Sequence, residues 1–267
     1  MRQEIRNKSK RSQVTIFVII AIAIVAVLLV VYFPQLKKII IPAAPSEYVP
    51  LDCIEKIVNG NLGKIMLRGG TMNPELNFRY NNISIAYICY TSEWYKTCTM
   101  QKPFLKTSAE KELEVISQAE IAKCINGMED RLKAKGYSVK TTGSKSAKIS
   151  IMPEKIAVEF NMTMALTKGE ETSLLSANQF KANINSNSYD ILMIASSIQN
   201  FEARFGDANI EDYMTYYPNL KVEKKRQSDG TKVYIITDRN TKEVLQFATR
   251  SLAWPPGFAL PVTSTYD

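Results

Sequence analysis

A predominantly apolar run of 20 residues near the start of the chain, from Val14 to Phe33, constrains this sequence more than any other feature. Thr15 is its only clearly polar side chain. A helix rises about 1.5 Å per residue, so a helix of this length spans about 30 Å, the thickness of the hydrocarbon core of a bilayer. Buried helices of soluble proteins are usually shorter and interrupted by polar positions. The run therefore predicts one transmembrane helix, which we place at residues 13–33.

The charges on either side orient this helix. Residues 1–12 carry five basic side chains and one acidic side chain, whereas Lys37 and Lys38 are the charges that follow the run. Because the more basic flank stays in the cytoplasm, we expect a cytoplasmic N-terminus and residues from about 46 onward outside the cell membrane. The lipid bilayer is then a partner of the chain through Val14 to Phe33.

The chain divides into segments on this basis. The apolar run is long for the core of a cleaved signal peptide, and no small-x-small cleavage site follows it near residues 34–38, so an uncleaved anchor is the favoured reading. The domain beyond the stalk also admits a subdivision near residue 186. The predicted segments are a basic cytoplasmic tail (1–12), the transmembrane helix (13–33), a Pro-rich stalk (34–46), an extracytoplasmic domain (47–253) and a C-terminal tail (254–267).

The composition excludes several functional classes. The net charge of +8 comes mostly from the two flanks of the apolar run, because residues 46–267 hold 27 basic and 25 acidic side chains. A nearly balanced domain offers no basic face for nucleic acid. The chain has no histidine. This absence removes Ser/His/Asp and Cys/His catalysis, His-ligated zinc and imidazole acid–base chemistry. We expect no catalytic residues, no cofactor and no metal site, and hence no enzyme.

Hydrophobic periodicity predicts an α+β fold for the extracytoplasmic domain, with mainly antiparallel strands. Helices are expected from Leu51 to a stop at Gly69-Gly70, from about Thr107 to Gly136, over Tyr189–Phe205 and over Ile210–Tyr217. Strands are expected within Asn77–Met100 and over Tyr137–Thr142, Lys148–Met152, Ile156–Leu166, Gln179–Ile184, Lys221–Arg226, Lys232–Thr237 and Val244–Arg250.

Two local motifs refine this prediction. Thr107 and Glu110 have the spacing of a capping box, and Glu110, Glu112 and Glu114 would then complement the dipole at the start of the long helix. Gly143-Ser144-Lys145 reads as a turn between two strands.

The four cysteines, Cys53, Cys89, Cys98 and Cys124, all follow the apolar run. Their spacing does not match a zinc site, and outside the cell membrane disulfides are expected. Four cysteines allow three pairings, and the sequence alone does not choose among them. A bridge between Cys89 and Cys98 is sterically easy because they flank a predicted hairpin tip. Cys53 and Cys124 each lie in a helical pattern, so a bridge between them would join two helices.

Other polar groups have ordinary structural interpretations. Asn82-Ile83-Ser84 and Asn161-Met162-Thr163 are glycosylation sequons on the outer side, so Asn82 and Asn161 are candidate glycosylation sites. Acidic residues around a helix start are interpreted as caps because their spacing is not that of an EF-hand; these are Asp207, Glu211 and Asp212. The basic run Lys224-Lys225-Arg226 is interpreted as a solvated strand edge.

The leader resembles an archaeal class III, pilin-type signal, in which a basic and a small residue precede Gln and an apolar segment. Here Lys10-Arg11-Ser12-Gln13-Val14-Thr15 has that order. Ser12 stands where Gly or Ala is usual, and Phe17 stands where bacterial pilins place Glu. Pilins also continue their apolar helix into the head domain, whereas prolines interrupt this chain from Pro34 onward.

Along nearly its whole length the chain is similar to a family of single-span surface proteins of small-genome archaea. The features that carry the similarity are the leader Arg11–Phe17, the Cys53 helix ending at Gly69-Gly70, the long Cys124 helix, the Ile191–Phe205 helix and the close from Tyr234–Asp238 to Phe247-Ala248. The resemblance favours a pairing of Cys53 with Cys124, which leaves Cys89 with Cys98. It implies no catalytic residues.

Two functions remain as expectations. The preferred one is a membrane-anchored structural or interaction protein of the cell envelope, with envelope or surface proteins as partners. The alternative is a pilin-like subunit of a surface filament, processed near Ser12/Gln13 and assembled through its apolar helix.

Overall fold

The structure is a computed structural model that describes residues 20–25, 50–176 and 180–253. The chain forms two compact units, Met1–Ala44 and Pro45–Asp267. In the first unit, residues 20–25 are helical and their side chains are exposed. Within the described ranges, no helix combines the length and the apolar character that crossing a membrane requires. The rest of the predicted span Val14–Phe33, the basic tail, the stalk and the C-terminal tail lie outside the described residues.

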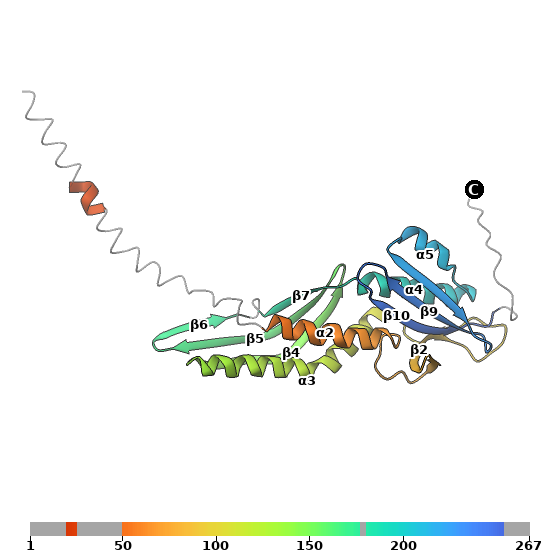
Figure 1. The fold of residues 1–267 in the computed structure, drawn as a ribbon, viewed down its shortest axis with the longest axis horizontal. Helices are drawn as coiled ribbons and strands as arrows, with labels where there is room; N and C mark the ends of the chain where they lie inside the picture. The colour runs from red at the N-terminus through yellow and green to blue at the C-terminus, as the bar shows by residue number, and fades with distance from the viewer. Residues whose placement is uncertain (1–19, 26–49, 177–179, 254–267) are drawn as a thin grey trace, which may run out of the picture. The chain divides into compact units, whose positions relative to one another are not determined.

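The second unit is an α+β fold with two sheets, in agreement with the sequence (Figure 1). Its helices are α2 (Leu51–Met66), α3 (Leu105–Ala134), α4 (Ser188–Phe205) and α5 (Ile210–Tyr216). Its strands are β1 (Asn77–Tyr80), β2 (Ile83–Tyr90), β3 (Thr99–Met100), β4 (Ser138–Met152), β5 (Lys155–Lys168), β6 (Glu171–Leu175), β7 (Lys181–Asn185), β8 (Leu220–Arg226), β9 (Thr231–Asp238) and β10 (Val244–Arg250).

The larger sheet has the order β1-β2-β10-β9-β8, and β3 also pairs with β2. β10 runs parallel to β2, and the other pairs are antiparallel. The apolar stripe of α4, formed by residues such as Ile191, Ala195 and Ile198, is fully buried and packs on β2, β9 and β10. Lys232 and Tyr234 alternate on β9 and reach α4 by hydrogen bonds, so they share the face that α4 covers.

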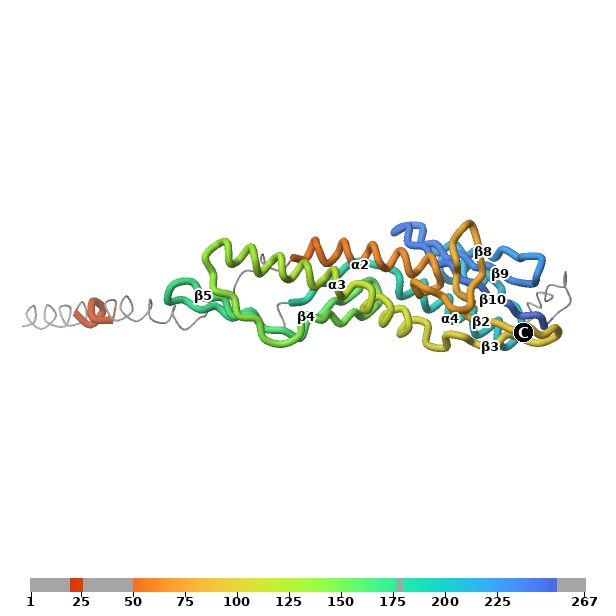
Figure 2. Tube along the Cα trace, turned by 90° about the horizontal axis from the view of Figure 1, so that it is seen from below, coloured from red at the N-terminus to blue at the C-terminus, as the bar shows by residue number. Residues whose placement is uncertain are grey.

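The smaller sheet joins β4, β5 and β6, with β7 on β5. Alternate residues of β5 are buried, from Ile156 to Leu166. α3 packs against this face of the sheet, over β4. α2 lies beside α3 (Figure 2) and is bonded to it by the Cys53–Cys124 disulfide. The outer face carries polar side chains such as Lys148, Glu159 and Asn183. The core of this part therefore lies between one face of the sheet and the two disulfide-linked helices.

The four helices predicted for the second unit all form, and α2, α3 and α4 end next to glycines. The amide of Gly70 bonds the carbonyl of Ile65 at 2.8 Å, and Gly69 and Gly70 both have φ near +80°. Gly206, also with positive φ, ends α4. The left-handed conformation at these helix ends is one that glycine adopts without steric cost.

The capping-box prediction is wrong. α3 begins at Leu105, before Thr107, and no side chain caps its first turn. The Glu110 carboxylate instead accepts the amide of Ile151 on β4 at 2.7 Å. A strand that is remote in the sequence supplied the donor, and local spacing carries no information about it.

Two strand predictions are also wrong. Gly143-Ser144-Lys145 is not a turn between strands but a register irregularity within the single strand β4. A Cβ at Gly143, where φ is +98°, would collide with the backbone of Asn161, so glycine is required there by close packing. The second error is an omission, because the sequence predicts no strand over β6. The sequence of β6 does not alternate between polar and apolar residues, so it gives little indication of a strand.

Candidate functional site

Both disulfides lie in the second unit. Cys53 of α2 bonds Cys124 of α3, and Cys89 of β2 bonds Cys98 just before β3. These are the two pairs that the family resemblance implies, and none of the four cysteines is free. The second bridge closes a loop whose tip exposes Trp94 and Tyr95, with 52% and 73% of their surfaces accessible.

The candidate glycosylation sites are exposed in the structure. Asn82 lies with Asn81 at the β1–β2 turn, where both residues have positive φ. A two-residue hairpin turn of this kind favours Asn. Asn161 lies on the outward face of β5. Both side chains are therefore accessible, while glycosylation itself stays a prediction.

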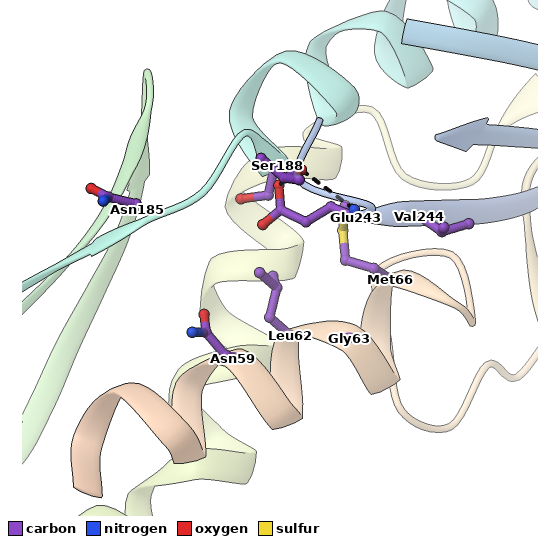
Figure 3. A pocket seen from close by; sticks show the side chains of 9 residues that line it. Asn59, Leu62, Gly63, Met66, Asn185, Ser188, Glu243 and Val244 are labelled. Carbon is purple, nitrogen blue, oxygen red and sulfur yellow. Dashed lines mark hydrogen bonds between the residues drawn. The ribbon is translucent and has the colours of Figure 1, made fainter. Parts of the chain in front are cut away.

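A small cavity of about 260 Å³ lies between α2, the start of α4 and the turn that follows β9. Figure 3 shows Leu62 and Met66 of α2 on one side and Glu243 with Ser188 on the other. Small-molecule sites usually enclose about 300–1,000 Å³, so this cavity is at or below the lower end of that range.

The one carboxylate in this cavity wall is already used. Glu243 Oε1 accepts the Ser186 hydroxyl at 2.6 Å, and its Oε2 accepts the amide of Asn187 at 2.7 Å and the Thr241 hydroxyl at 3.1 Å. Its charge therefore lies at the N-terminus of α4, where the helix dipole favours an anion. Glu243 is best explained as a cap that joins the β9–β10 turn to α4.

A second site is a cluster of ionisable side chains. It lies between the C-terminal end of α4 and strands β8 and β9, and we call it the Glu202 cluster. Its members are Glu202, Asp207, Lys224, Arg226, Lys232 and Tyr234.

The centre of the Glu202 cluster is removed from water. Glu202 has no accessible surface, and the Lys232 side chain has 8%. Lys232 Nζ donates to Glu202 Oε2 at 2.7 Å, to the Gly206 carbonyl and, at 3.3 Å, to Asp207 Oδ1. The Tyr234 hydroxyl donates to the other oxygen, Glu202 Oε1. Every strong polar atom at the centre thus has a partner, as a buried charge requires.

Asp207 forms the outer part of the cluster. Its Oδ1 accepts Lys224 Nζ at 2.8 Å and its Oδ2 accepts Arg226 Nη2 at 2.9 Å. The Asp207 side chain is 13% accessible, so it lies between the buried pair and the solvent.

The pKa values of the two carboxyl groups, Glu202 and Asp207, are shifted in opposite directions. Burial raises the pKa of Glu202 above its ordinary value, and Lys232 and Tyr234 only partly oppose this effect. Burial would also raise the pKa of Asp207, but Lys232, Lys224 and Arg226 together outweigh it and lower that pKa. Burial and the nearby Glu202 raise the pKa of Tyr234 well above its usual value, so its hydroxyl stays a donor.

Sequence reasoning missed this cluster. The apolar pattern of α4 predicts that Phe201 and Phe205 lie at the end of its buried stripe, but these side chains are 46% and 48% exposed and Glu202 is buried instead. The spacing from Ile198 allows either position to face the core. The available signal was Lys232 and Tyr234, two polar-tipped residues two apart that alternate with the apolar Val233 and Ile235 of β9.

The structure also corrects two related interpretations. Asp207 was grouped with Glu211 and Asp212 as caps, but it binds three basic side chains, and the amide of Glu211 is capped by the Asn209 side chain. The interpretation of Lys224-Lys225-Arg226 as a solvated edge holds for Lys225 and Arg226, whose side chains are exposed, but not for Lys224, which packs against Asp207.

The acidic residues of α3 form a different site. Glu110, Glu114 and Gln118 follow one another at intervals of four on α3. Their side-chain oxygens accept the amides of Ile151 at 2.7 Å, Ile149 at 2.8 Å and Ala147 at 3.3 Å. These amides lie along the edge of β4 that pairs with no strand in the described part of the sheet.

The dipole interpretation of these acids is therefore wrong. Glu110 and Glu114 satisfy the open edge of β4, and Glu112 accepts the amide of Met72 at 2.8 Å. An edge strand with unpaired amides is a template for pairing with another chain, and here side chains cover it.

No group of three or more Cys, Asp, Glu or His that could hold a metal ion occurs in the ranges that the structure describes. Comparisons of the chain with protein-family models, with curated proteins and with solved structures found no match.

Proposed function

We propose that this chain is a membrane-anchored protein of the cell surface, with a structural or interaction role and its disulfide-bonded domain outside the membrane. The observation that carries the proposal is the complete pairing of the cysteines in two disulfides. Such bonds persist in oxidising compartments and are rare in the cytoplasm. The apolar run Val14–Phe33 and its basic N-terminal flank supply the anchor and the orientation.

The exposed tip of the Cys89–Cys98 loop supports the interaction role. Trp94 and Tyr95 are held outward on a loop that the disulfide closes and that hydrogen bonds from Tyr95 and Leu252 tie to the C-terminal end of the domain. Trp and Tyr are enriched where proteins bind one another, because they contribute a large contact area at little entropic cost.

Topology is tested on intact cells that produce the full chain. External protease is expected to digest the domain beyond residue 46, and a membrane-impermeant maleimide is expected to label its cysteines only after reduction. A domain that resists protease until the cells are lysed, with thiols that react without reduction, contradicts the proposal.

The anchor is tested by two charges near its centre. The double substitution Ile22→Lys/Val25→Lys should release the protein from the membrane fraction, because each lysine costs about 2.5–3.5 kcal/mol at the centre of a membrane helix. Ile22→Leu/Val25→Leu is the matched control and should stay membrane-bound. Equal fractionation of the two variants would refute the anchor.

N-terminal sequencing of the mature protein separates the anchored protein from a filament subunit. We expect the chain to keep its N-terminal tail. A mature chain that begins at Gln13 would instead support the pilin-like alternative.

The interaction role is tested by photo-crosslinking on the same cells. A photoreactive amino acid in place of Trp94 should give a discrete adduct with an envelope protein, whereas the same group in place of Val115, which is 75% exposed on α3, should not. Equal adducts from the two positions would show that the loop has no special role.

A further inference from the structure

The Glu202 cluster places an amine and a carboxyl group in contact inside the protein. Lys232 Nζ lies 2.7 Å from Glu202 Oε2, so the carboxyl carbon is at most one C–O bond further away. Both side chains are almost completely removed from water. Groups held in contact in this way react with effective molarities of up to about 10⁵–10⁸ M.

The two neighbours of this pair have the functions that amide formation requires. Asp207 Oδ1 lies 3.3 Å from Lys232 Nζ, and Lys224 and Arg226 keep Asp207 ionised, so its carboxylate is available to accept a proton from the amine. The Tyr234 hydroxyl donates to Glu202 Oε1, the oxygen on which negative charge develops when the carboxyl carbon is attacked.

We propose that Lys232 and Glu202 join through an intramolecular amide bond between Nζ and Cδ, formed with Asp207 as the base and Tyr234 as the oxyanion donor. The bond would link the C-terminal end of α4 to β9. It goes beyond the proposed function, because it is a covalent modification of the domain that depends on neither the anchor nor the disulfides.

The reaction needs no oxidant and no co-reactant. Asp207 takes one proton from the Lys232 ammonium, and the free amine attacks Cδ of the Glu202 carboxylic acid, so that charge develops on Oε1. A second proton from Nζ goes to the departing Oε2 hydroxyl, the C–O bond breaks, and one water leaves. One N–H remains in the amide, and Asp207 gives its proton to the solvent.

The environment favours this product. Burial raises the pKa of Glu202, and a carboxylic acid is a better electrophile than a carboxylate. An ion pair in a dry interior carries a desolvation cost that a neutral amide avoids. The amide N–H keeps the Gly206 carbonyl as acceptor, and the amide oxygen keeps the Tyr234 hydroxyl as donor.

The mass of the full-length protein without substitutions tests the proposal directly. After reduction and denaturation, the protein should be lighter than its sequence by one water molecule. Trypsin should fail to cut after Lys232 and should leave peptide 182–204, which contains Glu202, joined to peptide 227–239. A full sequence mass with normal cleavage after Lys232 would overturn the proposal.

The same digest identifies the carboxyl group. Asp207 lies in a different tryptic peptide, 205–221, so a bond to Asp207 would give a different joined pair and would overturn the assignment to Glu202. Lys232→Arg keeps the positive charge and should restore the full mass. Persistence of the mass loss in this variant would place the modification elsewhere.

The roles of Tyr234 and Asp207 are tested by the rate of bond formation after synthesis. Tyr234→Phe removes one oxyanion donor, which typically slows a reaction about 10²–10³-fold, and Asp207→Asn removes the base. Both should lower the joined fraction at matched times. Tyr213→Phe is the control, because the Tyr213 hydroxyl also bonds α4, at Ser197, but lies outside the cluster. Equal rates in all three variants, with the disulfides formed, would overturn these roles.

Discussion

Two helices of this domain place glutamates against sheets, and the two sheets offer these carboxylates different hydrogen-bond donors. Along α3, Glu110 and Glu114 accept backbone amides from the edge of β4. On α4, Glu202 lies against β9 within the larger sheet, and it accepts the side chains of Lys232 and Tyr234.

The difference follows from where a sheet has donors to offer. At an open edge, alternate amides have no strand partner, and a carboxylate that accepts them satisfies both groups. Inside a sheet the ladder uses these amides, so a carboxylate buried there needs a side-chain donor. The glutamate contacts at the edge of β4 are partly solvated, so water can replace a lost partner. The Glu202 contact on the larger sheet is buried, so loss of either partner leaves the other one unsatisfied.

Removal of Glu202 should have the largest effect on stability. Glu202→Ala leaves Lys232 buried without its carboxyl partner, whether the wild-type pair is an ion pair or an amide. This substitution should lower the free energy of unfolding by about 3–5 kcal/mol. Urea denaturation measures this cost. Glu211→Ala, at an exposed position on α5, is the control and should change stability by about 0.5 kcal/mol or less.

A double substitution sharpens the comparison. Glu202→Leu/Lys232→Met leaves no unpaired charge, so it should be clearly more stable than Glu202→Ala. A double variant that is no better than the single one would show that the loss arises from packing and not from charge.

The two disulfides should differ in their contributions. The Cys53–Cys124 bridge closes 71 residues and the Cys89–Cys98 bridge closes 9. On the chain-entropy relation these loops correspond to about 4 and about 2.5 kcal/mol. Thermal unfolding of the two paired Cys→Ser variants measures the difference. A larger loss from the short loop would mean that its native contacts outweigh loop entropy.

Loss of an edge acceptor should have a smaller effect. Glu114→Ala leaves the Ile149 amide without its acceptor, and water can reach part of this edge, so a loss of about 1–2 kcal/mol is expected. Glu120→Ala, exposed on the same helix, is the matched control. The exposed edge should also raise self-association, which analytical ultracentrifugation detects. An unchanged sedimentation profile would argue against a protective role for the carboxylate.

The smallest effect concerns the pH dependence of stability near α3. Burial opposes the charge of Glu129, but hydrogen bonds from Thr141 and Lys145 outweigh burial and lower its pKa. Its stabilisation is therefore complete above the unfolded pKa of about 4.3 and is lost as the pH falls through the lower folded pKa. Glu129→Gln should flatten this acidic limb by about 1 kcal/mol or less in unfolding titrations. A wild-type slope retained in the variant would assign the limb to other carboxylates.

Most helices and strands of the domain were predictable because their signals are local. The stripe from Leu51 to Ile65, the glycine stops at Gly136 and Gly206 and the turn at Gly230 depend on residues that are close in sequence. The predictions that were wrong depend on remote partners. Glu110 was assigned to a helix start because Ile151 could not be foreseen, and Gly143 was assigned to a turn because Asn161 was not known to lie against it.

The candidate chemistry shows the same limit. Phe201 and Glu202 follow Ile198 by three and four residues, so helical spacing allows either to face the core, and hydrophobicity alone favours the phenylalanine. Lys232 and Tyr234 reversed that choice, since their position on β9 gives the carboxylate two donors at a depth where it would otherwise be too costly to bury.

By itself the sequence determined the apolar run, the balanced charge of the domain, the lack of histidine and most of the order of helices and strands. These are properties of composition and of short-range periodicity. The tertiary structure alone decided which glutamate is buried and which one covers a strand edge, because hydrogen bonds and desolvation depend on the groups that folding brings into contact.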